Sequence, residues 1–172
     1  QTQVGGLSKV KPRLICVVSP TRTFSRGVYL SAISEWIFNN SIEHWAYTWT
    51  YPKIEQWLDA HLPGAIVTCL DFGQFELSQS TLTFTLEHFF YTHFGVPPEI
   101  AAAIFNSEDS WTVHKRHSQM PFQFKVKGRL RQSGDPQTSL VNNFIAIAVH
   151  RFVAFLTKNK QCFINNGDDV VI

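Results

Sequence analysis

Two adjacent aspartates directly follow an Asn-Gly pair in the stretch "NNGDDVV", residues 165–171. An Asn-Gly pair between apolar runs is typical of a β-hairpin, and acidic residues are ordinary in turns. One interpretation is therefore that Asp168 and Asp169 are turn residues only. Adjacent carboxylates repel each other, however, and a divalent cation between them reverses the local electrostatics. The pair predicts either an ordinary turn or metal-dependent chemistry.

A third carboxylate ends a predicted core strand. The stretch "AIVTCLD" is typical of a short buried strand that finishes on Asp71. Chemistry on a triphosphate needs hard oxygen ligands for magnesium, and carboxylates from neighbouring strands hold two ions well. Asp71, Asp168 and Asp169 are therefore candidate catalytic residues and candidate ligands of two Mg²⁺ or Mn²⁺ ions.

Positive charge is concentrated in two windows that contain no acidic residue, one before Glu35 and one over residues 110–134. Such clustering is typical of binding to a polyanion, although two solvated strand faces would give the same pattern. The cations of interest are Lys9, Lys11 and Arg13 in the first window and Lys125, Lys127 and Arg129 in the second. We expect the first group to neutralise a triphosphate and the second to bind RNA.

The elements that must position these residues are helices and short strands. Helices are predicted over residues 25–40, 52–61 and 82–95, and "WTVHK" is expected to form a hairpin with "FQFKVKGRL". Asp135 is a good N-cap and Pro136 a good first residue for a further helix of about 20 residues. Its expected buried stripe is Val141, Phe144, Ile145, Ala148, Val149, Phe152 and Phe155.

Two polar residues of that helix, Thr138 and Asn142, stack beside the stripe because they are four positions apart. A hydroxyl and an amide there are suited to reading a sugar, although capping or surface roles would also place them there. A strand and helix mixture of this kind predicts the α+β class.

Composition sets further limits. The 172 residues, of which 44% are hydrophobic, suit one folded unit with a real core. Three widely spaced cysteines suggest neither a disulfide framework nor a zinc site, so a reducing compartment fits best. No purely apolar run approaches the roughly 20 residues that cross a bilayer, so no transmembrane segment is expected in this chain.

The order of these motifs resembles the fingers-to-palm sequence of viral RNA-dependent RNA polymerases, particularly those of positive-strand RNA viruses. "DFGQFELSQS" is similar to the first palm motif, with Asp71 as metal ligand and Glu76 where the family usually has a second Asp. "SGDPQTSLVNN" resembles the second motif and "GDD" the third, while "KVKPRLICVVSP" resembles the basic fingers motif less specifically. "KGRLRQSGD" is similar to alphavirus-like and tombusvirus-like enzymes.

The resemblance implies a fold and a division of the chain. It implies a right-hand polymerase palm with a small antiparallel sheet and packed helices, in which the Asp71 strand lies beside the Asp168 hairpin. Residues 1–64 would be part of the fingers and residues 65–172 the palm core, without a thumb. Because the thumb is absent and the last strand is short, we expect the 172-residue chain alone not to synthesise RNA.

The resemblance also implies roles for individual residues. Asp71 and Asp168 would be the principal metal ligands, with Asp169 assisting. The residues near the nucleotide would be Ser133 and Gly134, which shape a loop near the template and incoming base, and Thr138, Asn142 and Glu76, which recognise the ribose 2′-hydroxyl. Partners would be template and product RNA, ribonucleoside triphosphates and other viral replication proteins, within a replication complex in the host cytoplasm.

Two other functions stay open at this level. A reverse transcriptase shares the palm acids, but it typically has a bulky residue before the acidic pair, and Asn166-Gly167 argues against that. A catalytically silent RNA-binding module would use the basic windows while the acids only turn a hairpin. Magnesium-dependent nucleotide incorporation separates these alternatives from a polymerase.

Overall fold

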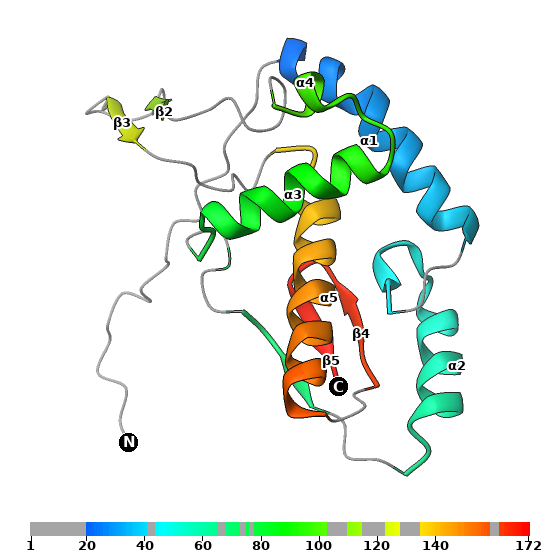
Figure 1. The fold of residues 1–172 in the computed structure, drawn as a ribbon. Helices are drawn as coiled ribbons and strands as arrows, with labels where there is room; N and C mark the ends of the chain where they lie inside the picture. The colour runs from blue at the N-terminus through cyan, green and yellow to red at the C-terminus, as the bar shows by residue number, and fades with distance from the viewer. Residues whose placement is uncertain are drawn as a thin grey trace, which may run out of the picture.

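The computed structural model describes residues 20–40, 44–64, 68–72, 75, 78–102, 110–114, 123–127, 135–158 and 162–172. Its helices are α1 (Pro20–Asn40), η1 (Ala46–Thr48, a 3-10 helix), α2 (Tyr51–His61), α3 (Thr81–His93), α4 (Pro98–Ile100) and α5 (Thr138–Thr157). Its strands are β1 (Cys69–Leu70), β2 (Ser110–His114), β3 (Gln123–Lys127), β4 (Ile164–Asn166) and β5 (Asp169–Val171). Helices combined with small antiparallel sheets fit the predicted α+β class (Figure 1).

Three of the strands form an antiparallel sheet in the order β1–β5–β4. Leu70 pairs with Val170 on one side of β5, and Asn165 pairs with Val170 on the other. Thr68 and Ile172 extend the β1–β5 ladder by exchanging two backbone hydrogen bonds of 2.9 and 3.0 Å. Backbone bonds thereby fix the segment around β1 alongside a hairpin that lies far from it in the sequence.

Both faces of the β4–β5 hairpin are covered, because successive residues of a strand point to opposite sides, whereas Cys69 and Leu70 of the edge strand β1 are exposed. Val170 is 1% exposed and belongs to a cluster with Ala146 of α5. Its neighbour Val171 packs in a different cluster, with Trp57 of α2 and Ile164 of β4. Figure 1 shows α5 crossing one side of the β4–β5 hairpin, with α2 beyond β4. The sheet is therefore a middle layer between α5 and α2.

The main core lies where α1, α3 and α5 meet. Its central side chains are Leu30, Ile33 and Ile37 of α1, Phe90 and Tyr91 of α3, and Leu140, Val141 and Ile145 of α5. Spacings of three and four residues put the α1 and α5 side chains on one stripe of each helix. Because α5 also packs on the sheet, it is the element that joins this core to the strands.

The predicted buried stripe of α5 is correct only in its first half. Val141 and Ile145 are buried, but Val149, Phe152 and Phe155 are 38%, 60% and 78% exposed. Within the described residues, α5 is long and apolar enough to cross a membrane by length and composition alone, a test that core helices of soluble proteins also pass. The core explains the apolar character of the first half.

The start of α5 also differs from the prediction. Its first residue is Thr138 rather than Pro136, and Asp135 is not its N-cap. The Asp135 carboxylate instead accepts hydrogen bonds of 2.8 Å from Arg26 Nη1. Asp135 therefore takes part in a long-range ion pair that the local sequence does not indicate.

The prediction of a buried strand before Asp71 is wrong, because Cys69 and Leu70 of β1 are both exposed at the edge of the sheet. Most other predicted elements are confirmed. The helices over 25–40 and 52–61 correspond to α1 and α2, although α1 begins earlier, at Pro20. The apolar helix is α3, which is followed by Gly95 at a φ of 82°. β2 and β3 pair as the expected antiparallel hairpin, with Trp111 opposite Val126. Local sequence patterns thus predict the elements well, and the errors lie in which faces become covered.

The turn of the β4–β5 hairpin requires a glycine, because Gly167 has a φ of 71°. An added Cβ is strained in this conformation. We expect Gly167→Ala to lower the free energy of unfolding by about 1 kcal/mol, measured by urea denaturation followed by circular dichroism. The matched control is Gly27→Ala inside α1, where a Cβ would meet no described atom within 4 Å. Gly27→Ala should raise the free energy of unfolding by about 0.5–1 kcal/mol. Equal decreases in the free energy of unfolding for Gly27→Ala and Gly167→Ala would contradict the turn assignment.

Candidate active site

Asp71 directly follows the last residue of β1, and Asp169 is the first residue of the neighbouring strand β5. Thr68 and Ile172 exchange both of their backbone hydrogen bonds across the β1–β5 ladder, whose last pair before Asp71 is Leu70 with Val170. If this register continues by one residue, Asp71 faces Asp169 in a position without ladder bonds. Paired Cα atoms in such positions lie about 4.5 Å apart and their side chains share one face. Both aspartates are exposed.

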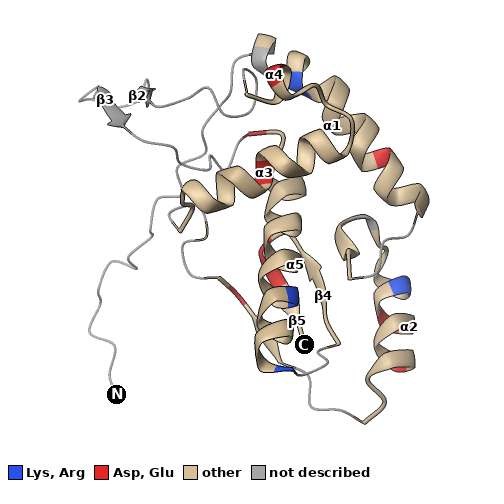
Figure 2. Ribbon diagram, viewed as in Figure 1, with Lys and Arg blue, Asp and Glu red and all other residues tan. Residues whose placement is uncertain are grey.

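The third aspartate, Asp168, lies in the tight turn between β4 and β5. Asn166 pairs with Asp169, so Gly167 and Asp168 form a two-residue turn. A positive φ at the first of these positions only is typical of a type II′ turn, which suits the twist of a hairpin. Figure 2 shows acidic positions both on the segment that follows β1 and on the hairpin. The fold therefore gathers all three candidate acids at one end of the sheet.

The chemistry of these donors fits magnesium, which prefers oxygen ligands and commonly uses only one or two protein carboxylates together with water and phosphate. Asp71, directly after β1, and Asp169, the first residue of β5, are exposed carboxylates of this kind. Within the described part of the chain, however, no group of three or more His, Cys, Asp or Glu side chains is assembled to hold a metal. The aspartates are neighbours without forming a closed three-ligand site.

A pair of asparagines ties the acidic hairpin to α5. Asn165 Nδ2 donates to the backbone oxygen of Asn143 at 3.1 Å and to Asn143 Oδ1 at 3.0 Å, and it lies 3.5 Å from the Gly167 carbonyl oxygen. The two asparagines are 1% and 0% exposed. Because unpaired buried amides are costly, this contact fixes the turn relative to the helix. Neither residue is a candidate in the sequence analysis. The only feature of the sequence that could have indicated them is that each belongs to an Asn-Asn pair next to apolar residues.

The candidate ribose-reading residues lie in the first turns of α5 and both are buried. Thr138 is 9% exposed and Asn142 is 3% exposed. Asn142 Oδ1 has no hydrogen-bond partner among the described residues. A buried acceptor without a partner is costly, so a ligand that donates a hydrogen bond would relieve the cost. The first turns of α5 therefore carry a polar position suited to receiving a hydroxyl.

The remaining candidate residues cannot be placed. Those outside the described residues are Lys9, Lys11, Arg13, Glu76, Arg129, Ser133 and Gly134. Lys125 and Lys127 lie in β3, opposite Thr112 and Ser110, but their side chains are not described. The predicted strand alternation around Lys125 and Lys127 is consistent with the β2–β3 ladder, and their binding role stays a prediction.

An apolar cavity of about 340 Å³ lies beside Asp71, between β1 and the second half of α5. Its lining is Leu70, Asp71, Phe72, Val149, His150, Val153 and Ile172. The His150 ring lies 5.1 Å from the Phe163 ring and 6.1 Å from the Phe72 ring, measured between centroids. Burial among these groups lowers the pKa of His150 from its usual 6.5. Burial therefore disfavours the protonated form of this imidazole.

Comparison with known proteins gives one match. The family model described as RNA dependent RNA polymerase matches residues 29–172. The matched range contains Asp71, the Thr138–Asn142 segment and the acidic hairpin. No curated protein and no solved structure matches the chain.

The buried His150 gives the fold a pH dependence whose sign follows from its lowered pKa. The unfolded chain binds a proton near pH 6.5 that the folded chain resists, so stability falls as the pH decreases through this range. We expect the urea midpoint to decrease between about pH 7.5 and about pH 5. His150→Gln should remove this part of the decrease, whereas His93→Gln, at an exposed position, should not. Identical pH profiles for wild type and His150→Gln would contradict the assignment.

Proposed function

Because the chain belongs to the RNA-dependent RNA polymerase family, we propose that Asp71, Asp168 and Asp169 form its catalytic metal-binding centre. The family indicates a viral enzyme that synthesises RNA under the direction of RNA, with RNA and ribonucleoside triphosphates as substrates. The observation that supports the proposal is the pairing of β1 with β5, which holds the segment that continues into Asp71 beside the hairpin that carries Asp168 and Asp169.

Two Mg²⁺ or Mn²⁺ ions, when bound, would activate the 3′-hydroxyl of the growing strand and stabilise the pyrophosphate leaving group. Asp71 and Asp168 are the principal ligands in this proposal, and Asp169 assists. Their carboxylates come from two chain segments that backbone hydrogen bonds hold together, so little reorganisation is needed before binding. The mutual repulsion of the three acids favours the uptake of cations.

The ribose of the incoming nucleotide would be read from α5. Asn142 Oδ1 is a buried acceptor without a partner among the described residues, and a ribose 2′-hydroxyl is a donor that a deoxyribose lacks. Thr138 lies one helical turn earlier on the same side. Glu76 would orient Asn142 from across the site or through a water. Ser133 and Gly134 would shape the loop near the template and incoming base.

The basic residues complete the proposal by matching the charge of the substrates. Phosphate contacts dominate the affinity of proteins for nucleic acids and make it dependent on salt. Triphosphate neutralisation is assigned to Lys9, Lys11 and Arg13, and RNA binding to Lys125, Lys127 and Arg129. In the same proposal residues 1–64 are part of the fingers and residues 65–172 the palm core.

The cellular setting belongs to the proposal as well. We place the protein in the host cytoplasm, in a complex with other viral replication proteins that replicates and transcribes a viral RNA genome. The competing function is a catalytically silent RNA-binding module, which would need neither the three aspartates nor a metal ion. Substitution of Asp71 and Asp168 therefore distinguishes the polymerase from this module.

We expect Asp71→Asn and Asp168→Asn, each in the full-length protein, to reduce nucleotide incorporation by at least about a thousandfold, because each removes a metal ligand. RNA affinity should change little. Primer-extension kinetics with Mg²⁺ and a filter-binding assay measure the two properties. The matched control is Asp59→Asn, at an exposed position of α2.

Charge reversal of Lys125 and Lys127 should have the opposite profile. Loss of phosphate contacts should weaken RNA affinity and flatten its dependence on salt, with a smaller effect on turnover once RNA is bound. Near-normal Mg²⁺-dependent turnover in either aspartate variant would refute the two-metal assignment.

Asn142→Ala should lower the preference for ribonucleotides over deoxyribonucleotides by on the order of 1–3 kcal/mol, the range for a buried hydrogen bond, while detectable chemistry remains. Glu76→Asp, which restores the family's usual residue, should be tolerated much better than Glu76→Ala. Single-nucleotide incorporation with matched ribo and deoxy substrates measures both effects. Asn39→Ala, at an exposed position of α1, is the control. Unchanged discrimination in both Asn142→Ala and Glu76→Ala would overturn the ribose assignment.

A further inference from the structure

We infer that Arg26 is a positioning residue that sets the start of α5, and with it the polar residues that face the nucleotide. The inference rests on the proposed function, because that proposal places Thr138 and Asn142 at the ribose. The hydrogen bonds of Arg26 to Asp135 and Gln137 lie just before these side chains in the sequence. Arg26 therefore acts through the turn that precedes them.

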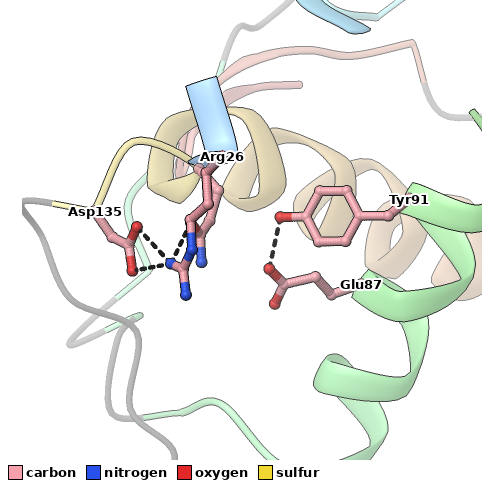
Figure 3. A network of polar contacts seen from close by, with 5 residues as sticks. Arg26, Glu87, Tyr91 and Asp135 are labelled. Carbon is pink, nitrogen blue, oxygen red and sulfur yellow. Dashed lines mark hydrogen bonds and ion pairs between the residues drawn. The ribbon is translucent and has the colours of Figure 1, made fainter. Parts of the chain in front are cut away.

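Arg26 reaches from α1 to this turn and contacts three acceptors there. Its Nη1 atom lies 2.8 Å from each of Asp135 Oδ1, Asp135 Oδ2 and Gln137 Oε1. Arg26, Asp135 and Gln137 are 1%, 7% and 5% exposed. Figure 3 shows the guanidinium between Asp135 on one side and the Glu87–Tyr91 pair of α3 on the other. Arg26 therefore lies at the junction of three segments that are remote in the sequence.

The same turn is connected directly to the helix. Thr138 N donates to the Asp135 backbone oxygen at 3.0 Å, and Val141 N donates to the Gln137 backbone oxygen at 2.9 Å. A shift of Asp135 or Gln137 would thus be transmitted to the first turn of α5. Since small misplacements of substrate-positioning groups can reduce rates by on the order of a hundredfold, the position of this turn matters for Asn142.

The energetics of the contact favour a positioning role over a purely stabilising one. Moving both charges out of water carries a desolvation cost that their attraction repays only with good geometry. Apolar residues of similar volume often stabilise a fold equally well, but they lack direction. The three hydrogen bonds fix where the turn lies relative to α1, and an apolar contact would not.

Paired substitutions separate position from stability. Arg26→Met leaves the Asp135 carboxylate buried without a cation, and Asp135→Leu leaves the Arg26 guanidinium buried without an anion. Each single variant of the full-length protein should therefore have a lower melting temperature. The double variant Arg26→Met/Asp135→Leu removes both charges and should recover most of the lost melting temperature. We expect it still to show kcat/KM for ribonucleotides lowered on the order of tenfold or more, with a reduced ribo-to-deoxy ratio and unchanged RNA affinity. Recovery of kinetics together with stability would overturn the inference.

Gln137→Met provides a second variant that keeps the ion pair intact. It removes one acceptor at similar volume, so the melting temperature should stay close to wild type while the ribo-to-deoxy ratio decreases severalfold. Wild-type discrimination in this variant and in the folded double variant, together with unchanged hydrogen exchange of residues 138–142, contradicts the positioning role.

Hydrogen exchange distinguishes failure of this inference from failure of the proposed function. In the double variant and in Gln137→Met, amides of residues 138–142 should exchange faster, while those of the β4–β5 hairpin should keep their protection. Faster exchange with normal ribose discrimination would sink the ribose assignment and leave Arg26 as an anchor of α5. Unchanged exchange in both variants would sink the inference itself, whatever the outcome for Asp71→Asn.

Discussion

The antiparallel pairing of β1 with β5 is the constraint on which the candidate site depends. It joins two segments that are remote in the sequence, and it is short, with Cys69 and Leu70 as the paired residues of β1 and one further backbone contact at Thr68. A slip of one residue would turn every side chain of β5 to the opposite face. Such a slip is disfavoured because Val170 packs toward α5 whereas Val171 packs toward α2. Apolar packing on both faces therefore specifies which residue faces Asp71.

Much of this arrangement is predictable from the sequence because it is encoded locally. The alternation of "FQFKVK", the apolar spacing of α3 and the Asn-Gly hairpin each report a preference that the structure keeps. Which face of a helix or strand is buried is not encoded locally, because it depends on the elements that pack against it. Helical spacing shows that α5 has an apolar stripe, but only α1, α3 and the sheet decide that Ile145 is buried while Phe155 is exposed. Trp36 of α1 is a similar case, because it is 49% exposed although the next residue, Ile37, is 2% exposed.

The missed polar residues have the same physical explanation. Asp135 has ideal capping chemistry, yet its carboxylate bonds to Arg26, 109 residues away. The local sequence around either residue does not indicate this ion pair, because the two side chains meet only after α1 and α5 have packed together. The Asn143–Asn165 contact likewise depends on the sheet lying against the helix. By contrast, Asp71 and the hairpin acids could be predicted because strand ends and turns are recognisable in the sequence.

The polar groups are distributed according to what their burial costs. Like charges repel each other more weakly where water screens them than in the protein interior, where the effective dielectric constant is lower. Exposure of Asp71 and Asp169 at the strand ends therefore keeps their mutual repulsion low before any cation is bound. The buried charge in the described region is handled differently, since Arg26 lies against Asp135 and the Glu87 carboxylate accepts a 2.7 Å hydrogen bond from Tyr91. Because the Asn142 side chain is neutral, burying it on α5 costs far less free energy than burying a carboxylate at the same position. Exposed carboxylates at the end of the sheet and neutral or paired polar groups beneath it therefore keep the cost of burying charge low in the folded chain.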